Sequence, residues 1–207
     1  MATPEINRTR RTSTTPKHGQ LTGFPRRIKD CVADIHNAIQ KWESSKNKGF
    51  NLVSDIANLK IASRAYDEAS CYPNGLENMC SNLKIIYDNM ENLCIKMNKI
   101  TVQLQKIAKL NSQSSSDIYF MTWPASNLFE TVKQISDMHK EELEAKKAIV
   151  ESIAHVDLMS NGEIRDTDSS RDILMTYVAC WLHEPFINEE TRTIMMEELL
   201  LETGHHQ

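Results

Sequence analysis

Residues 76–107 read LENMCSNLKIIYDNMENLCIKMNKITVQLQKI. Apolar side chains recur along this stretch at alternating steps of three and four residues, and no proline or glycine interrupts them. That spacing, sustained over about four heptads, predicts one helix with a coiled-coil seam, about 48 Å long at about 1.5 Å per residue. The seam consists of Leu76, Met79, Leu83, Ile86, Met90, Leu93, Met97, Ile100, Leu104 and Ile107.

Such a seam has to be covered by a partner helix, because a compact small domain is too short to bury it. The partner is another part of this chain, a second copy or a different protein. The apolar face predicted for residues 124–155 is nearly as long, so this segment of the same chain remains an alternative partner for the seam. Our leading hypothesis is that a partner subunit binds the seam. The residues predicted to bind it are Leu76, Leu83, Ile86, Met90, Leu93, Met97, Ile100, Leu104 and Ile107.

The composition of the whole chain favours helices. Its 207 residues include only six glycines and six prolines, and Leu, Ile, Met, Lys and Glu are abundant. We therefore predict an all-α fold of long antiparallel helices with a coiled-coil segment. The five cysteines are odd in number and form no CxxC pair, which favours a reducing compartment. Because no run of about 20 apolar residues and no signal peptide is evident, we expect a soluble intracellular protein.

Residues 1–24 form a basic segment of Thr, Ser, Pro and Gly with almost nothing to bury, and we predict that this tail is disordered. Thr3 and Thr15 each precede proline and are candidate sites for a proline-directed kinase. The tail's arginines are able to contact nucleic acid or to act as a nuclear import signal. Since the last third of the chain is acidic and the net charge is −4, nonspecific nucleic-acid binding by the whole chain is disfavoured.

A helical hairpin is predicted over residues 25–70. Apolar residues from Ile28 to Trp42 alternate at steps of four and three, which places them on one helical face. Gly49 is predicted to end this helix as a C-cap, and a second amphipathic helix then starts near Leu52. Two helices connected this way pack antiparallel, with Trp42 buried near the closed end.

The second half of the chain is predicted to hold a linker and three more helices. The turn signal Pro73-Asn74-Gly75 precedes the long helix over residues 76–110, and a Ser-rich linker over 111–121 is the best internal boundary. The C-terminal helical region, residues 122–203, is predicted to start with a long helix at Pro124. A short helix ended by Pro185 follows, after an acidic loop from Asp157 to Asp168. The last helix runs from about Glu189 to Glu202 and ends at Gly204.

No motif for catalysis or for a cofactor is present. The glycines are too few and too scattered to form a phosphate-binding loop. Cys180 and His183 lie one turn apart, but a structural zinc site needs four ligands and the other close pair is His205-His206, so we expect no metal and predict that His183 caps or packs. Neighbouring glutamates are expected on solvated faces. Because no nucleophile, base and stabiliser occur together, we predict no enzyme and no cofactor.

Several blocks of residues stand in a specific order along the chain. The closing blocks are Trp181-Leu182-His183-x-Pro185-Phe186 and Leu200-Leu201-Glu202-Thr203-Gly204-His205, and the middle ones are Thr122-Trp123-Pro124 and Ala154-His155. The N-terminal blocks are Ile28-Lys29-Asp30, Ala33-Asp34, His36-Asn37, Lys41-Trp42-Glu43, Gly49-Phe50 and Ile56-Ala57-Asn58-Leu59-Lys60-Ile61. In order and spacing they resemble the cyclin-dependent kinase 2-interacting protein family. The chain departs from the family's pattern in its His205-His206-Gln207 end and in a longer acidic loop around Asn161-Gly162.

The resemblance implies a small nuclear helical adaptor without catalytic activity, with a cytoplasmic fraction left open. Its implied partners are cyclin-dependent kinase 2, the Cdc7 kinase, the ATR-interacting protein, and AAA ATPases together with a small coiled-coil subunit. The implied processes are the cell cycle, DNA replication, the DNA damage response and maturation of the large ribosomal subunit. We predict that the C-terminal part binds a larger machine through Trp181, His183, Pro185, Leu201, Glu202, Gly204 and His205. The alternative is a module that contacts nucleic acid through its basic tail.

Overall fold

The computed structural model describes residues 23–65, 73–111, 119–156 and 166–205. Its helices are α1 (Phe24–Ala65), α2 (Leu76–Asn111), α3 (Ala125–Ser152) with the 3-10 turn η1 (Ile153–His155), α4 (Asp166–His183) and α5 (Glu189–Glu202). The predicted all-α class is confirmed. Most of the basic tail with Thr3 and Thr15, most of the Ser-rich linker and most of the acidic loop lie outside the described residues.

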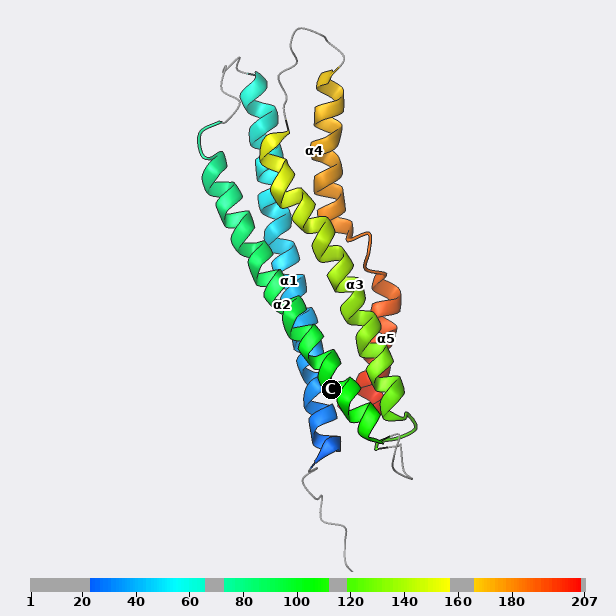
Figure 1. Ribbon diagram of the computed structural model, residues 1–207. Coiled ribbons are helices and arrows are strands. Elements are labelled where there is room, and N and C mark those ends of the chain that lie inside the picture. Colours follow the sequence, from blue (N-terminus) through cyan, green and yellow to red (C-terminus); the bar gives the residue numbers. More distant parts are fainter. Residues whose placement is uncertain (1–22, 66–72, 112–118, 157–165, 206–207) are drawn as a thin grey trace, which may run out of the picture.

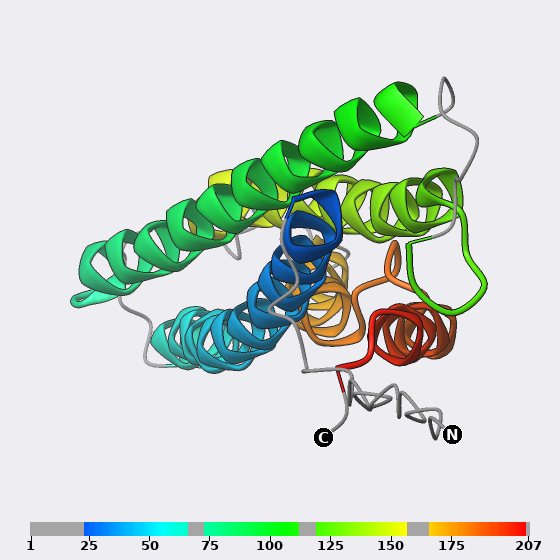
Figure 2. The ribbon, with the colours of Figure 1, turned by 90° about the horizontal axis from the view of Figure 1, so that it is seen from below.

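The helices form an antiparallel bundle with four positions. In Figure 1, α1 and α3 run upward and α2 runs downward, and α2 packs against both of them. The fourth position is filled by two short helices, α4 and then α5, which both run downward and follow one another along the bundle (Figures 1 and 2). The fourth helix of the bundle is therefore broken, and the break lies at residues 184–188.

Two apolar cores follow one another along the bundle, and each has its own piece of the fourth helix. The lower core combines the first half of α1, the second half of α2 and the first half of α3 with Met196 and Leu199 of α5. The upper core combines the opposite halves of the three long helices with Leu174 and Trp181 of α4. Because α1, α2 and α3 run through both cores, they connect α4 and α5 into one packed unit.

The predicted hairpin over residues 25–70 is wrong, because α1 is one helix of 42 residues that continues through Gly49. Gly49 is buried and does not adopt a positive φ, so it does not cap a helix end. A Cβ at this position would lie only 2.6 Å from Cε2 of the Trp181 indole. The glycine therefore permits close approach of α4 to α1, and Trp42 lies in the middle of the bundle instead of at a closed end.

The long helix predicted over residues 76–110 is confirmed as α2, but its seam is covered within the chain. Leu83, Met90 and Met97 are fully buried, and the seam residues either lie in the two cores or pack against them. Since α1 and α3 are themselves long, they cover the seam along its length. The hypothesis that a partner subunit occupies these residues is therefore wrong for this fold.

The other predicted boundaries hold in part. Gly75 and Gly204 have φ values of 91° and 67° and lie in the turns before α2 and after α5. The internal boundary predicted within 111–121 does not separate two domains, because α3 shares both cores with α1 and α2, α4 joins the upper core and α5 the lower core. Phe120, inside that predicted linker, packs on the lower core. None of the described helices combines the length and apolar character that crossing a bilayer requires.

Candidate functional site

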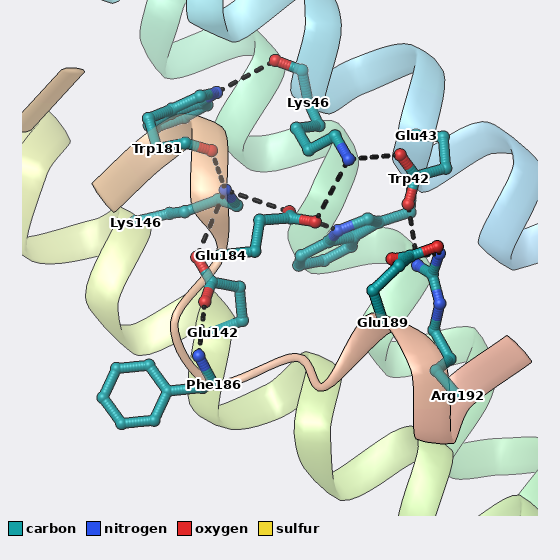
Figure 3. A network of polar contacts seen from close by, with 10 residues as sticks. All are labelled: Trp42, Glu43, Lys46, Glu142, Lys146, Trp181, Glu184, Phe186, Glu189 and Arg192. Carbon is teal, nitrogen blue, oxygen red and sulfur yellow. Dashed lines mark hydrogen bonds and ion pairs between the residues drawn. The ribbon is translucent and has the colours of Figure 1, made fainter. Parts of the chain in front are cut away.

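A buried cluster of charges lies where the fourth helix breaks. Lys146 of α3 has no exposed surface, and its Nζ lies 3.1 Å from Oε1 of Glu184 and 3.2 Å from Oε1 of Glu142 (Figure 3). The same nitrogen donates a hydrogen bond to the carbonyl oxygen of Trp181, at 3.1 Å. Burial raises the pKa of the Glu142 carboxyl, and Lys146 and the backbone N–H of Phe186 oppose that shift. One lysine thus joins α3 to the end of α4 and to the junction.

Glu184 is the residue at which α4 turns into the junction, and it has a φ of 46°. A residue with a Cβ pays about 1–2 kcal/mol for this left-handed conformation, which usually belongs to glycine after a helix end. Its carboxylate accepts a hydrogen bond from Nε1 of Trp42 at 2.8 Å and lies 3.5 Å from Nζ of Lys46. These contacts, together with Lys146, offset the backbone cost and hold the junction against α1.

Arg192 attaches the first turn of α5 to α1. Its guanidinium, almost wholly buried, donates to Glu43 at 2.7 Å and forms two hydrogen bonds to Glu189, as Figure 3 shows. Burial by itself would lower the pKa of Arg192, but the two carboxylates outweigh it and raise that pKa. The same Glu43 also forms an ion pair with Lys46, so the clusters at the two sides of the break are continuous.

A second anchor fixes the end of α5 to the start of α3. The Glu202 carboxylate accepts hydrogen bonds from the backbone N–H groups of Thr122 and Trp123, at 2.6 and 2.7 Å, and from the Thr122 hydroxyl. Burial opposes ionisation of Glu202, but these donors outweigh it and hold the pKa below its usual value. Lys29 of α1 donates to the carbonyl oxygen of Gly204 at 3.1 Å. Glu202 and Gly204, predicted to bind a partner, therefore serve contacts within the chain.

The remaining predicted binding residues divide into buried and exposed ones. Trp181 is fully buried, and its indole N–H donates to the carbonyl oxygen of Lys46. His183 and Pro185 are exposed. Of the two roles predicted for His183, packing is therefore wrong, and capping of the end of α4 stays a prediction. Leu201 is 59% exposed, whereas His205 is partly buried beside the Thr203 hydroxyl. Only part of the predicted site is thus available at the surface.

Several large apolar side chains of α4, α5 and their junction face solvent, and we call this set the C-terminal surface. On α5, Ile194 and Leu201 are exposed and seven residues apart, so they share one face of the helix, opposite the buried Leu199. The exposed Glu197 and Glu198 lie on the same outer side. The C-terminal surface consists of Met175, Leu182, Phe186, Ile194 and Leu201, while the exposed Ile173 lies on the other flank of α4. When a helix is apolar on its outer side as well as on the side packed in the core, the outer side usually binds another molecule.

Sequence reasoning missed the buried charges, although α3 carried a signal for them. Along its buried face, steps of four and three lead from Ile135 through His139, Glu142 and Lys146 to Ile149. Three polar residues thus occupy consecutive core positions, and such residues need partners. The sequence carries no comparable signal for Glu184 and Arg192, because the apolar and polar residues around them do not follow a regular helical spacing.

The charged groups of the cluster are paired with one another. The buried carboxylates of Glu142 and Glu184 form ion pairs with Lys146, and Glu184 also pairs with Lys46. Arg192 pairs with the half-buried Glu43 and the exposed Glu189. Among the residues that the structure describes, no three His, Cys, Asp or Glu side chains are grouped so as to hold a metal ion. The cluster therefore acts as a structural lock at the break of the fourth helix.

Comparison with known proteins places the chain in a family, although no protein-family model matches it. Cyclin-dependent kinase 2-interacting protein of Xenopus laevis is 36% identical over 210 residues, which cover 92% of this chain and 94% of that protein. The Mus musculus and Homo sapiens proteins of the same name are 31% and 30% identical over 213 residues, with the same coverage. The chain belongs to the cyclin-dependent kinase 2-interacting protein family. Members of this family are named for an interaction and not for a reaction.

The structure brings together several sequence blocks that carried the resemblance to the cyclin-dependent kinase 2-interacting protein family. Thr122 and Trp123 of the middle block bind Glu202 of the closing block. In the same way, Gly49 faces Trp181, and Trp42 donates to the junction that follows α4. In this chain these residues of the family's pattern therefore form internal contacts of the bundle.

Proposed function

We propose that this protein is a non-catalytic adaptor that binds cyclin-dependent kinase 2. The supporting observation is its relation, over 92% of its length, to proteins named for that interaction. An adaptor of this kind contributes binding surfaces on a stable scaffold. The buried lock at residues 184–188 suits this role, because it fixes α4 and α5 on the bundle without using their outer sides.

The C-terminal surface is our candidate for the kinase contact. Phe186 and Leu201 are 49% and 59% exposed, and exposed aromatic and aliphatic side chains commonly anchor protein interfaces. His183 and Pro185 border this surface. The heptad seam of α2 is excluded from the contact, because α1 and α3 already cover it.

The resemblance supports a wider set of roles, which we propose as contexts of the same scaffold. One role is binding to the Cdc7 kinase and to the ATR-interacting protein in DNA replication and the DNA damage response. A further one is membership of an AAA ATPase complex with a small coiled-coil subunit in maturation of the large ribosomal subunit. A nuclear location would fit all of them. Phosphorylation at Thr3 or Thr15 is proposed as regulation by a proline-directed kinase.

Direct binding of the purified full chain to cyclin-dependent kinase 2, measured by surface plasmon resonance, tests the proposal. Leu201→Asp and Phe186→Asp should each weaken binding at least about tenfold, because each introduces a charge into an apolar contact. Ile85→Asp is the matched control, since Ile85 is as exposed as Leu201 but lies on α2. Circular dichroism should show that all three variants keep the helical fold. Absence of wild-type binding, or equal binding by all variants, would contradict the proposal.

The basic tail supports a second candidate, contact with nucleic acid. Residues 8–17 include Arg8, Arg10, Arg11 and Lys17 and no acidic residue. Deletion of residues 1–22 should then abolish binding to a single-stranded RNA, and binding by the full chain should fall steeply with added salt. Salt-independent binding, or binding that survives the deletion, would argue against the tail.

A further inference from the structure

A groove lies between the first turn of α1 and the last four turns of α2, at the lower end of the bundle in Figure 1. It has a volume of about 570 Å³. We call it the α1–α2 groove, and its lining residues used below are Phe24, Arg27, Lys99, Val102, Lys106 and Leu110. It lies away from the α4–α5 junction, and neither the lock nor the proposed kinase contact uses it.

Three of the residues that line the α1–α2 groove are positively charged. Arg27, Lys99 and Lys106 are exposed, and none of them forms an ion pair with a residue that the structure describes. From Asn92 to Asn111, α2 contains four lysines and no acidic residue. The nearby acids of α1 are engaged, since Asp34 pairs with Lys96 and Asp30 with Arg26. Among the described residues, no acidic side chain therefore pairs with Arg27, Lys99 or Lys106.

The α1–α2 groove is also lined by the apolar residues Phe24, Val102, Ile107 and Leu110. Val102 and Leu110 remain 40% and 58% exposed, and Ile95, seven residues before Val102, is 47% exposed. Steps of seven and eight keep these side chains on the side of α2 opposite its buried seam, and Lys99 and Lys106 lie among them on that same side. Phe24 contributes the facing wall from α1. The groove thus combines apolar and cationic side chains along one side of α2.

We propose that the α1–α2 groove binds one acidic amphipathic helix of a partner protein. Apolar side chains of such a helix would cover Val102, Leu110 and Phe24, and its carboxylates would pair with Arg27, Lys99 and Lys106. Residues 99–110 span about 17 Å, which matches about three helical turns. The exposed apolar residues Val102 and Leu110 among the cations disfavour a nucleic-acid backbone, and the basic charge of residues 8–17 disfavours the chain's own tail.

Fluorescence anisotropy with the full chain tests this proposal. The probe is a fluorescein-labelled designed helix of about four turns, with Leu on one face and Glu elsewhere; its control carries Lys in place of Glu. We expect the acidic helix to bind and the basic helix not to bind. Lys99→Glu with Lys106→Glu should raise the dissociation constant at least about tenfold, and Val102→Asp should do the same. Lys140→Glu with Lys147→Glu, both exposed on α3, should leave it unchanged.

Three results would overturn the proposal. The first is no saturable binding of the acidic helix, or equal binding by the Lys99→Glu and Lys106→Glu double variant. The second is tighter binding of a single-stranded RNA that competes with the peptide and is insensitive to Val102→Asp, which would assign the groove to polyanions. The third is concentration-dependent dimerisation in light scattering that the groove variants abolish, which would assign it to a second copy. Circular dichroism of each variant excludes unfolding as the cause.

Discussion

At the scale of single residues, Gly49 reverses the effect that glycine usually has in a helix. Replacing an exposed helical glycine by alanine normally stabilises a protein by about 1 kcal/mol. Here the added Cβ would overlap the Trp181 indole, which itself donates a hydrogen bond to Lys46. Packing of α4 on α1 therefore depends on the absence of a side chain at this position.

We predict that Gly49→Ala lowers the free energy of unfolding by about 1–3 kcal/mol, because the indole has to move out of a packed core. Urea denaturation measures this change. Adding Trp181→Phe should recover part of the loss, since phenylalanine lacks the second ring that meets the Cβ. Asn47→Ala, at an exposed position two residues away, should change stability by at most about 0.5 kcal/mol. Stabilisation by Gly49→Ala would refute the close packing.

A second residue-scale prediction concerns His139, which is fully buried beside the Trp42 ring, with ring centroids 5.0 Å apart. Its Nδ1 donates to the Ile135 carbonyl oxygen at 2.7 Å, and Nε2 has no hydrogen-bond partner in the described part of the chain. Burial lowers the pKa of His139 to about 4 from its usual 6.5. The unfolded chain therefore binds a proton that the folded chain does not bind between these two pH values.

The free energy of unfolding should consequently fall as pH decreases from about 7 toward 4, by on the order of 3 kcal/mol from this group. His139→Phe retains a ring against Trp42 and cannot titrate, so its stability should depend less on pH across that window. Urea denaturation of both proteins at several pH values measures the difference, in which contributions of groups that both proteins retain, such as Glu142, largely cancel. Parallel pH profiles would show that His139 does not control acid sensitivity.

At the scale of elements, the heptad repeat of α2 predicted the helix correctly, but our prediction of what covers the helix was wrong. The alternation of three and four predicted the helix and its buried face, and both are confirmed. Periodicity gives an apolar face but not the identity of the element that covers it. The hairpin predicted over residues 25–70 was wrong for a related reason. A glycine that ends a helix cannot be distinguished in sequence from a glycine that allows a neighbouring helix to pack closely.

The intramolecular position of the seam makes a prediction for the isolated protein. Met97→Ala should lower the free energy of unfolding by about 2–5 kcal/mol without any partner present, because Met97 is fully buried in the lower core. Ile95→Ala, two residues away on the same helix but 47% exposed, should cost at most about 1 kcal/mol. Urea denaturation compares them. Equal and small losses would mean that the seam is not packed within the single chain.

At the scale of the whole molecule, the three long helices connect both cores, and a boundary within residues 111–121 does not divide the fold. We therefore predict one cooperative unfolding transition. Far-ultraviolet circular dichroism and tryptophan fluorescence should have coincident thermal midpoints, because Trp42 and Trp181 lie in the upper core and Trp123 packs on the lower core. Two separate transitions would indicate that residues 122–203 unfold as an independent domain.

The sequence by itself determined the helical class, most helix ends and the turns at Gly75 and Gly204. These features depend on side-chain period and on backbone conformations that a few neighbouring residues set locally. Only the tertiary structure decided that the seam of α2 is internal, that Lys146 and Glu184 lock a broken fourth helix, and that Val102 and Leu110 line one groove together with Arg27, Lys99 and Lys106. Each of these depends on which distant segments meet, because the free energy of a buried charge or an apolar face is set by the partner that removes it from water.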